Sequence, residues 1–215
     1  MNIDLPDKQY FSKPFIILAN GQYPSHLSAL NKLHTAGTII CTDGSANKLL
    51  ENGLAPNVII GDMDSSTIDQ DAFKGLYVKI IDQENTDLDK AFEWCKLNNL
   101  SPLTVLGTSQ LREDHTIGNL ILLTNYSDEL DINFVTDYFT ITCHHGKRSF
   151  TSFKQQLVSI VPVEDIQSIT TEGLEFPLID EPFPLSSRGI SNRATSHQFI
   201  ITSSGKIWVF RSHSD

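Results

Sequence analysis

Several aspartates stand directly after short apolar runs, where the strands of a sheet would end. They are Asp43, Asp62, Asp64, Asp82 and Asp87. In an open α/β sheet the ligand binds beyond the carboxyl ends of the strands, so these positions favour a binding site. Carboxylates brought together repel each other unless a cation neutralises them, and Mg²⁺ suits hard oxygen ligands combined with substrate phosphates. The pattern therefore predicts a magnesium site that handles phosphate.

Each aspartate also has a purely structural interpretation. An aspartate after a strand is often a turn residue or a helix N-cap, and the charge of Asp87 would favour the start of a helix. A metal site is favoured because three separate strand ends carry the same side chain. Gly61, which precedes Asp62, would let a ligand approach the backbone closely.

A second polar constellation is the segment GTSQLREDH at residues 107–115, predicted as a loop between a strand and a helix. Arg112 can bind a phosphate through two N–H groups, and the helix N-terminus that follows adds backbone donors. The alternative is a solvated or ion-paired surface arginine. In that interpretation Asp114 is only a helix cap and His115 only a surface residue.

Other kinds of site are not supported. Cys143, His144 and His145 are adjacent, and neighbouring residues of a strand point to opposite faces, which argues against zinc. The chain lacks a GxxxxGK[ST] phosphate loop, a GxGxxG dinucleotide loop and a GxSxG nucleophile elbow. The formal charge of −10 over 215 residues argues against nucleic acid as a partner, because nucleic-acid binding needs clustered Lys and Arg.

The sequence predicts a cytoplasmic protein without a membrane segment. Its three cysteines lie far apart and form no CxxC pair, which indicates a reducing compartment. Residues 1–12 are polar and include acidic groups, unlike a secretory signal. No apolar run approaches the roughly 20 residues that cross a bilayer.

Apolar runs alternate with helical spacing up to about residue 145. The expected strands are 15–19, 38–41, 58–60, 77–81, 103–106 and 132–135, and the expected helices cover 27–33, 46–50, a segment from Asp87 and the region around 117–121. This alternation predicts an α/β domain, residues 1–145, with a doubly wound, mostly parallel sheet. Residues 146–215 predict a small antiparallel β-sandwich, with 203–205 turning a hairpin between its last two strands.

Four blocks of this sequence resemble the thiamin pyrophosphokinase family. In chain order they are CTDGSANKLLENGLAPNVIIGDMDS (41–65), ENTDLDKAF (84–92), REDHTIGN (112–119) and GISN (189–192). The first block is highly specific, and the order and spacing of the blocks cover most of the chain. The resemblance implies transfer of the terminal pyrophosphoryl group of ATP to the thiamin hydroxyl, which gives thiamin diphosphate and AMP. It also implies an α/β catalytic domain, a C-terminal β-sandwich, and a homodimer in which thiamin lies between the catalytic domain of one subunit and the sandwich of the other.

Matched residue by residue, the resemblance assigns roles to the same aspartates. Asp62, Asp64 and Asp87 would hold Mg²⁺ on the ATP phosphates and would form the catalytic set with Arg112. The residues expected around ATP are Asp43, Asn20, Gly21, Arg112 and His115. Those expected around thiamin are Asp114, Ser191, Asn192 and Trp208. Trp208 would offer its aromatic face to the cationic ligand, although an ordinary core or interface position is the alternative.

The sequence departs from the family pattern at two places. Gln110 and Leu111 occupy positions where the family commonly has two glycines, and Ser45 gives DGSAN in place of DGGAN. A bulkier loop affects the fit of the nucleotide more than the metal site. Two other functions use the same residues: a noncatalytic thiamin or nucleotide sensor, and a metal-dependent phosphohydrolase with water as acceptor. The hydrolase would leave Ser191 and Trp208 without a purpose.

Overall fold

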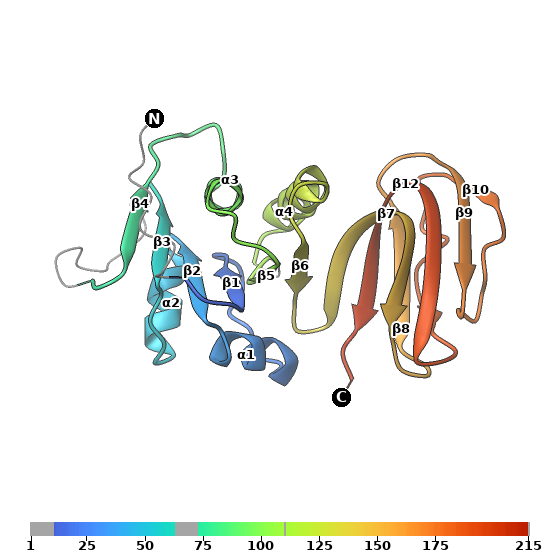
Figure 1. Cartoon of the computed structure of the whole chain (residues 1–215), viewed down its shortest axis with the longest axis horizontal. Helices are drawn as coiled ribbons and strands as arrows, with labels where there is room; N and C mark the ends of the chain where they lie inside the picture. Colours follow the sequence, from blue (N-terminus) through green and yellow to red (C-terminus); the bar gives the residue numbers. More distant parts are fainter. Residues whose placement is uncertain (1–10, 63–72, 110, 215) are drawn as a thin grey trace. The chain divides into compact units, whose positions relative to one another are not determined.

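The computed structural model describes residues 11–62, 73–109 and 111–214. The chain forms two compact units, Met1–Asp137 and Tyr138–Asp215, which we call unit 1 and unit 2 (Figure 1). Residue 145, where the sequence analysis divides the chain, lies inside strand β7 (Phe139–Thr151). None of the described helices is long and apolar enough to span a membrane.

Unit 1 contains a sheet of six parallel strands in the order β6-β5-β1-β2-β3-β4. The strands are β1 (Phe15–Leu18), β2 (Thr38–Thr42), β3 (Val58–Gly61), β4 (Leu76–Lys79), β5 (Leu103–Leu106) and β6 (Ile132–Val135). All residues of β1, β2 and β3 are buried, which explains why these strands appear as continuous apolar runs rather than alternating ones. The predicted α/β class is confirmed.

Helices cover both faces of this sheet. They are α1 (Leu27–His34), α2 (Ser45–Glu51), α3 (Asp87–Leu97) and α4 (Glu113–Tyr126). Figure 1 shows α1 and α2 on one side of the sheet and α3 and α4 on the other. Right-handed crossovers require this arrangement, because the chain moves outward from β1 to β4 and then returns to place β5 beside β1. The direction of strand order therefore reverses between β1 and β5.

Unit 2 is antiparallel and has no helix among its described residues. Its strands are β7, β8 (Leu157–Pro162), β9 (Ile166–Glu172), β10 (Glu181–Phe183), β11 (Asn192–Arg193) and β12 (Gln198–Ser212). The first part of β12 pairs with β9 and the second part pairs with β8, while β7 pairs along both parts. One strand thus contributes to both layers of the predicted sandwich, around a core that includes Phe150, Val158 and Phe199.

The predicted hairpin at residues 203–205 is wrong. These residues lie within β12, where the register with β7 shifts between Ser203 and Ile207. The shift is stabilised locally, since Ser203 Oγ donates to the Gly205 carbonyl at 2.8 Å and the Lys206 amide donates to Glu164 Oε1 at 2.9 Å. Serine and glycine here produce an irregularity in one strand rather than a reversal of the chain.

Replacing Phe92 by alanine tests the core under α3. Phe92 is fully buried, and its ring lies 6.3 Å from that of Phe134, measured between centroids. We expect the free energy of unfolding to fall by about 3–5 kcal/mol. Urea denaturation would be followed through buried Trp94 in a Trp208→Phe background. The control is Leu97→Ala on the same helix, where the side chain is 56% exposed and the expected change is about 0.5 kcal/mol. Equal losses would contradict this core.

Candidate functional site

A cavity of about 310 Å³ opens at the point where the strand order of unit 1 reverses. Asn20 and Gly21, which follow β1, form part of its wall, and Thr108 and Ser109, which follow β5, form another part. At such a point, the segments that follow two neighbouring parallel strands lead to opposite faces of the sheet. A crevice forms between these segments, and α/β proteins bind ligands in it. The topology therefore determines where the cavity lies.

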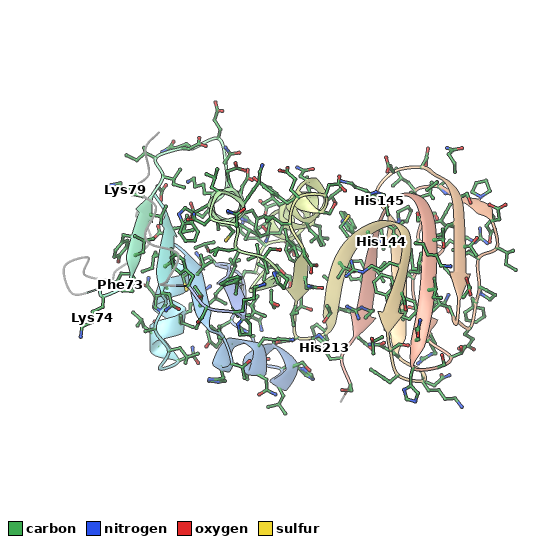
Figure 2. All side chains as sticks on the ribbon, in the orientation of Figure 1. Phe73, Lys74, Lys79, His144, His145 and His213 are labelled. Carbon is green, nitrogen blue, oxygen red and sulfur yellow. The ribbon has the colours of Figure 1, made fainter. Side chains whose placement is uncertain are left out.

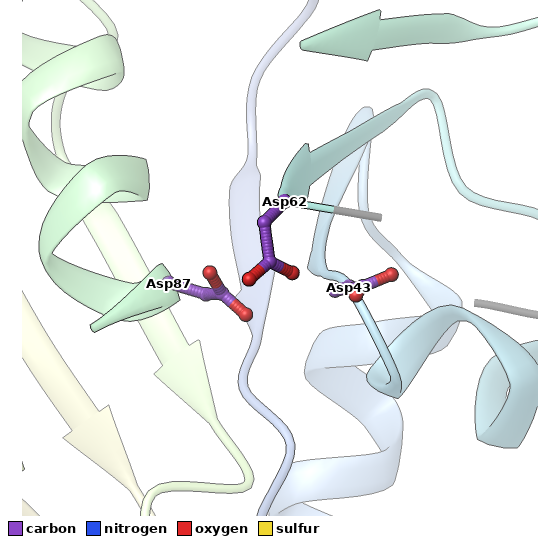
Figure 3. A group of neighbouring side chains, drawn as sticks. All are labelled: Asp43, Asp62 and Asp87. Atoms are coloured by element: carbon purple, nitrogen blue, oxygen red, sulfur yellow. The ribbon is translucent and has the colours of Figure 1, made fainter. Parts of the chain in front are cut away.

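Three aspartates meet beside this cavity. Asp43, Asp62 and Asp87 each offer a carboxylate oxygen, and these oxygens all lie within 4.8 Å of one another (Figure 3). Asp43 is 1% exposed, and the other two are half-buried. Asp64, the fourth predicted member, lies outside the described residues. Carboxylates this close favour a divalent cation between them.

The fold brings the three aspartates together from separate elements. Asp43 follows β2, and its amide donates to the Ile60 carbonyl of β3 at 2.9 Å. Asp62 follows β3, and Asp87 is the first residue of α3. Gly61 makes the close approach possible: a Cβ added there would lie 2.8 Å from Asp43 Cβ and 3.3 Å from Asp87 Cγ.

Lys90 supplies a positive charge to this cluster. Its Nζ lies 3.0 Å from Asp87 Oδ1, and only 5% of its side chain is exposed. The two residues are three positions apart on α3, where side chains of a helix meet. Lys90 was not among the predicted site residues, although its spacing from Asp87 within ENTDLDKAF could have identified it. Lys90 offsets part of the repulsion and limits the rotamers of Asp87.

Asp82 does not join the cluster, although it also follows a strand. Its carboxylate accepts hydrogen bonds from the Glu84 amide at 2.9 Å and from Asn85 Nδ2 at 2.7 Å. These bonds lower the pKa of Asp82, the Glu84 amide contributing most. The structural interpretation therefore applies to this aspartate, which forms a turn.

Arg112 and His115 lie in the cavity wall at the start of α4. Arg112 donates through Nε to Asp114 Oδ1 at 3.0 Å and through Nη2 to Oδ2 at 2.5 Å, and both side chains are about two-thirds exposed. These bonds, followed by the His115 amide, lower the pKa of Asp114 to about 2. The exposed carboxylate therefore stays ionised and holds the guanidinium at the cavity rim.

Backbone contacts fix the cavity wall between β1 and β5. Lys48 Nζ donates to the carbonyls of Asn20 at 3.0 Å and of Gly21 at 2.7 Å. The Gly21 amide in turn donates to the Gly107 carbonyl at 2.8 Å, so the two loops are joined directly. Asn119 Nδ2 donates to the Thr108 carbonyl at 2.8 Å from the side of α4.

Lys48 and Asn119 were not predicted as site residues, although they lie in the family-like blocks 41–65 and 112–119. Both side chains act on backbone carbonyls rather than on ionisable groups, and no residue spacing indicates such contacts. Only the fold places them at the cavity.

The predicted thiamin residues of the C-terminal region all lie in unit 2. Ser191 has a left-handed backbone with φ 66°, and its amide donates to Ser159 Oγ at 3.0 Å. Asn192 is 9% exposed, and its side chain bonds both the amide and the carbonyl of Phe176, at 3.1 Å and 2.7 Å. Trp208 is a half-buried residue of β12. Asn192 therefore has a structural role in holding the loop that presents Ser191.

An acidic cluster beside a cavity at the carboxyl edge of a parallel sheet is typical of α/β enzymes that handle nucleotide phosphates with a divalent cation. Comparison with known proteins defines the family. Residues 30–135 match the model of the thiamin pyrophosphokinase catalytic domain, and residues 138–210 match the model of the thiamin pyrophosphokinase substrate-binding domain. The chain belongs to the thiamin pyrophosphokinase family.

Individual relatives agree with this assignment. Thiamin pyrophosphokinase 1 of Caenorhabditis elegans is 25% identical over 94% of this chain and 98% of its own length. Thiamine pyrophosphokinase of Bacillus subtilis is 28% identical over 65% of this chain and 69% of its own. The crystal structure of the Bacillus subtilis enzyme superposes with a TM-score of 0.77 at 23% identity, covering 94% of this chain and 100% of that one. The Candida albicans enzyme superposes with a TM-score of 0.78 at 17% identity, covering 93% and 89%.

These findings confirm the predictions of family, fold class and enzyme class. The reaction of the family is ATP-dependent formation of thiamin diphosphate, and its members are diphosphokinases. A kinase that uses ATP generally requires a divalent metal ion. The individual site residues remain predictions.

Gly61→Ala tests whether the three carboxylates act as one site. The added methyl group would push Asp43 and Asp87 apart, so we expect Mn²⁺ binding, measured by electron paramagnetic resonance titration, to weaken about tenfold or more. Gly118→Ala is the matched control, because a Cβ there meets nothing within 4 Å. Equal Mn²⁺ affinity in the Gly61 variant and the wild type, with both folded by circular dichroism, would contradict a shared site.

Proposed function

We propose that this chain transfers the pyrophosphoryl group of ATP to thiamin with Mg²⁺ held by Asp62, Asp64 and Asp87. The observation that supports this most is the cluster of Asp43, Asp62 and Asp87 at the cavity, since carboxylate oxygens within 4.8 Å of one another repel and a divalent cation would neutralise them. All of the donors are hard oxygens, which suits Mg²⁺ better than zinc. Asp43 would complete the negative wall beside the ligands.

Mg²⁺, when bound, would neutralise the charge of the phosphate chain. The protein's own residues do the rest by positioning the substrates. Arg112 lies at the cavity rim. There it would pair with phosphate oxygens, and the amides at the start of α4 would add donors beside it. Asn20, Gly21 and His115 complete the proposed ATP wall.

The chemical step exchanges one phosphorus–oxygen bond for another. The thiamin hydroxyl oxygen attacks the β-phosphorus in line, and the bond between that phosphorus and the oxygen bridging to the α-phosphate breaks. The bridging oxygen leaves with AMP, and the hydroxyl proton passes to a base or to solvent. Catalysis of such a step depends on alignment and charge stabilisation, which are the tasks of Arg112 and the acidic cluster.

Thiamin would bind in a homodimer with shared sites. Asp114 would meet the pyrimidine from unit 1, while Ser191, Asn192 and Trp208 would come from unit 2 of the partner subunit. An apolar stripe on α4 supports association with a second copy: Ile117 is 58% exposed and Ile121, four residues later on the same helix face, is 50% exposed.

A cytoplasmic location is part of the same proposal. Cys41, Cys95 and Cys143 are all free and buried, as expected for a protein of a reducing compartment.

Product analysis of two aspartate variants tests the reaction and its site together. The protein would be incubated with ATP, Mg²⁺ and thiamin, and AMP, ADP and thiamin phosphates would be separated by chromatography. We expect AMP and thiamin diphosphate in equal amounts, and none after removal of the metal with EDTA. Asp62→Asn and Asp87→Asn should lower the rate about a hundredfold or more, because each removes a ligand charge.

Asp82→Asn is the matched control, since Asp82 also follows a strand but only caps a turn. Its rate should stay near that of the wild type. Wild-type rates in the Asp62 and Asp87 variants would refute the site. ADP with thiamin monophosphate would mean that the γ-phosphorus is attacked, and free phosphate or diphosphate without thiamin diphosphate would indicate a hydrolase.

A purified heterodimer tests the shared site. One subunit would carry Asp87→Asn and the other Trp208→Ala, which we expect chiefly to weaken thiamin binding. If each site combines unit 1 of one subunit with unit 2 of the other, one of two sites is intact and carries about half the wild-type rate. If each site lies within one subunit, both sites are damaged. A heterodimer no more active than the mean of its two parent homodimers would exclude shared sites.

A further inference from the structure

Several buried polar atoms of unit 2 have no hydrogen-bond partner among the described residues. Two of them, Thr142 Oγ1 and Arg211 Nε, can donate a hydrogen bond to a ligand, whereas another, Gln156 Oε1, can only accept one. The strand register places these two donors on one face: Arg211 stands opposite Thr140 on β7, and Thr142 lies two residues along from Thr140 on the same strand. Buried polar groups in folded proteins are normally satisfied, so water or a ligand would supply the partners of these atoms.

Two arginines share one aromatic ring on the same side of the sheet. Arg211 Cζ lies 5.4 Å and Arg148 Cζ 5.3 Å from the ring centroid of Phe150, which is 3% exposed. The His144 ring lies 5.9 Å from the same ring in an edge-on arrangement. Figure 2 labels His144 in unit 2. Three basic side chains thus gather around Phe150.

This positive charge is not balanced within the part of the chain that the structure describes. There, Arg148 and Arg211 form no ion pair with a carboxylate. The Arg211 guanidinium donates to the Thr151 carbonyl at 3.5 Å, and the Arg148 guanidinium donates no hydrogen bond there. Burial, and then the charge of Arg148, lower the pKa of Arg211. Two neighbouring, half-buried arginines without a carboxylate partner offer a favourable place for another anion.

We propose that Arg148 and Arg211, with the Thr142 hydroxyl on the same face as Arg211, form a binding site for a phosphate group in unit 2, which we call the arginine-pair site. Phosphate suits paired guanidiniums because its oxygens accept two parallel N–H bonds from each. The same chemistry is offered by free inorganic phosphate or diphosphate and by the phosphate of a nucleotide. Cation–π contact with Phe150 holds both guanidiniums in place. Binding of a ligand therefore costs little further side-chain entropy.

The site consists of unit 2 residues alone, shares no residue with the aspartate cluster of unit 1, and does not depend on the proposed reaction. To remove any contribution from the unit 1 cavity, the parent protein for the test carries Arg112→Met and the buffer contains EDTA. Inorganic phosphate, diphosphate and AMP are titrated in turn into the full chain by calorimetry, at constant ionic strength.

We expect the parent to bind phosphate, and Arg148→Met and Arg211→Met each to weaken that binding about tenfold or more, because each removes a charged donor pair. Methionine keeps an apolar stem against Phe150, which favours folding, and the two variants test the site independently. Arg188→Met is the matched control, since Arg188 is an exposed unit 2 arginine paired with Glu181 at 2.9 Å, and it should bind phosphate as the parent does.

The three ligands distinguish the sources of the phosphate group. Binding of inorganic phosphate or diphosphate would assign the site to the free ion, and binding of AMP alone would assign it to a nucleotide. Either result supports the site if the two arginine variants lose that binding. Equal binding in Arg148→Met and Arg188→Met would overturn the proposal. Absence of binding of all three ligands to the folded parent would overturn it as well.

Discussion

The repulsion among three carboxylates at one edge of a sheet is the constraint around which unit 1 is organised. With oxygens within 4.8 Å, each pair repels by about 3 to 4 kcal/mol at an effective dielectric constant of about 20. The fold tolerates this because the three strand and helix ends are fixed by the buried sheet. Gly61 leaves the space between them, and Lys90 supplies one positive charge. One ammonium cannot offset three repulsive pairs, so repulsion remains that a bound cation would relieve.

The remainder of the site combines rigid and adjustable parts. The wall between β1 and β5 is fixed, because Lys48 and the Gly21 amide bind carbonyls that cannot move without disturbing the sheet. The Arg112–Asp114 pair lies at the exposed rim, where water weakens the ion pair and lets the guanidinium exchange one oxyanion for another. In the proposed reaction, the fixed wall would set the position of the phosphate chain, and the exposed guanidinium would follow the chain during transfer.

Much of this arrangement could be predicted from the sequence, because parallel strands buried on both faces appear as apolar runs and their ends are easily located. That pattern identified the six strands of unit 1 and the aspartates after them. It could not separate Asp82 from Asp87, since both follow the same strand and only the path of the next turn decides which one reaches the cluster. Lys48 was missed because it acts on carbonyls. The hairpin expected near Gly205 was wrong because turn residues also occur at strand irregularities, where side chains such as Glu164 satisfy the backbone.

The continuity of β12 has a consequence for how this protein can vary. Trp208 and Arg211 are three residues apart on one strand and therefore point to opposite faces of it. Insertion of a single residue between them would exchange inner and outer side chains over the rest of the strand, and would turn Arg211 away from Phe150. The register shift between Ser203 and Ile207 is different, because pairing is already interrupted there. Length changes among relatives should accordingly concentrate at this short irregular stretch, and the segment from Trp208 to Arg211 should keep its length.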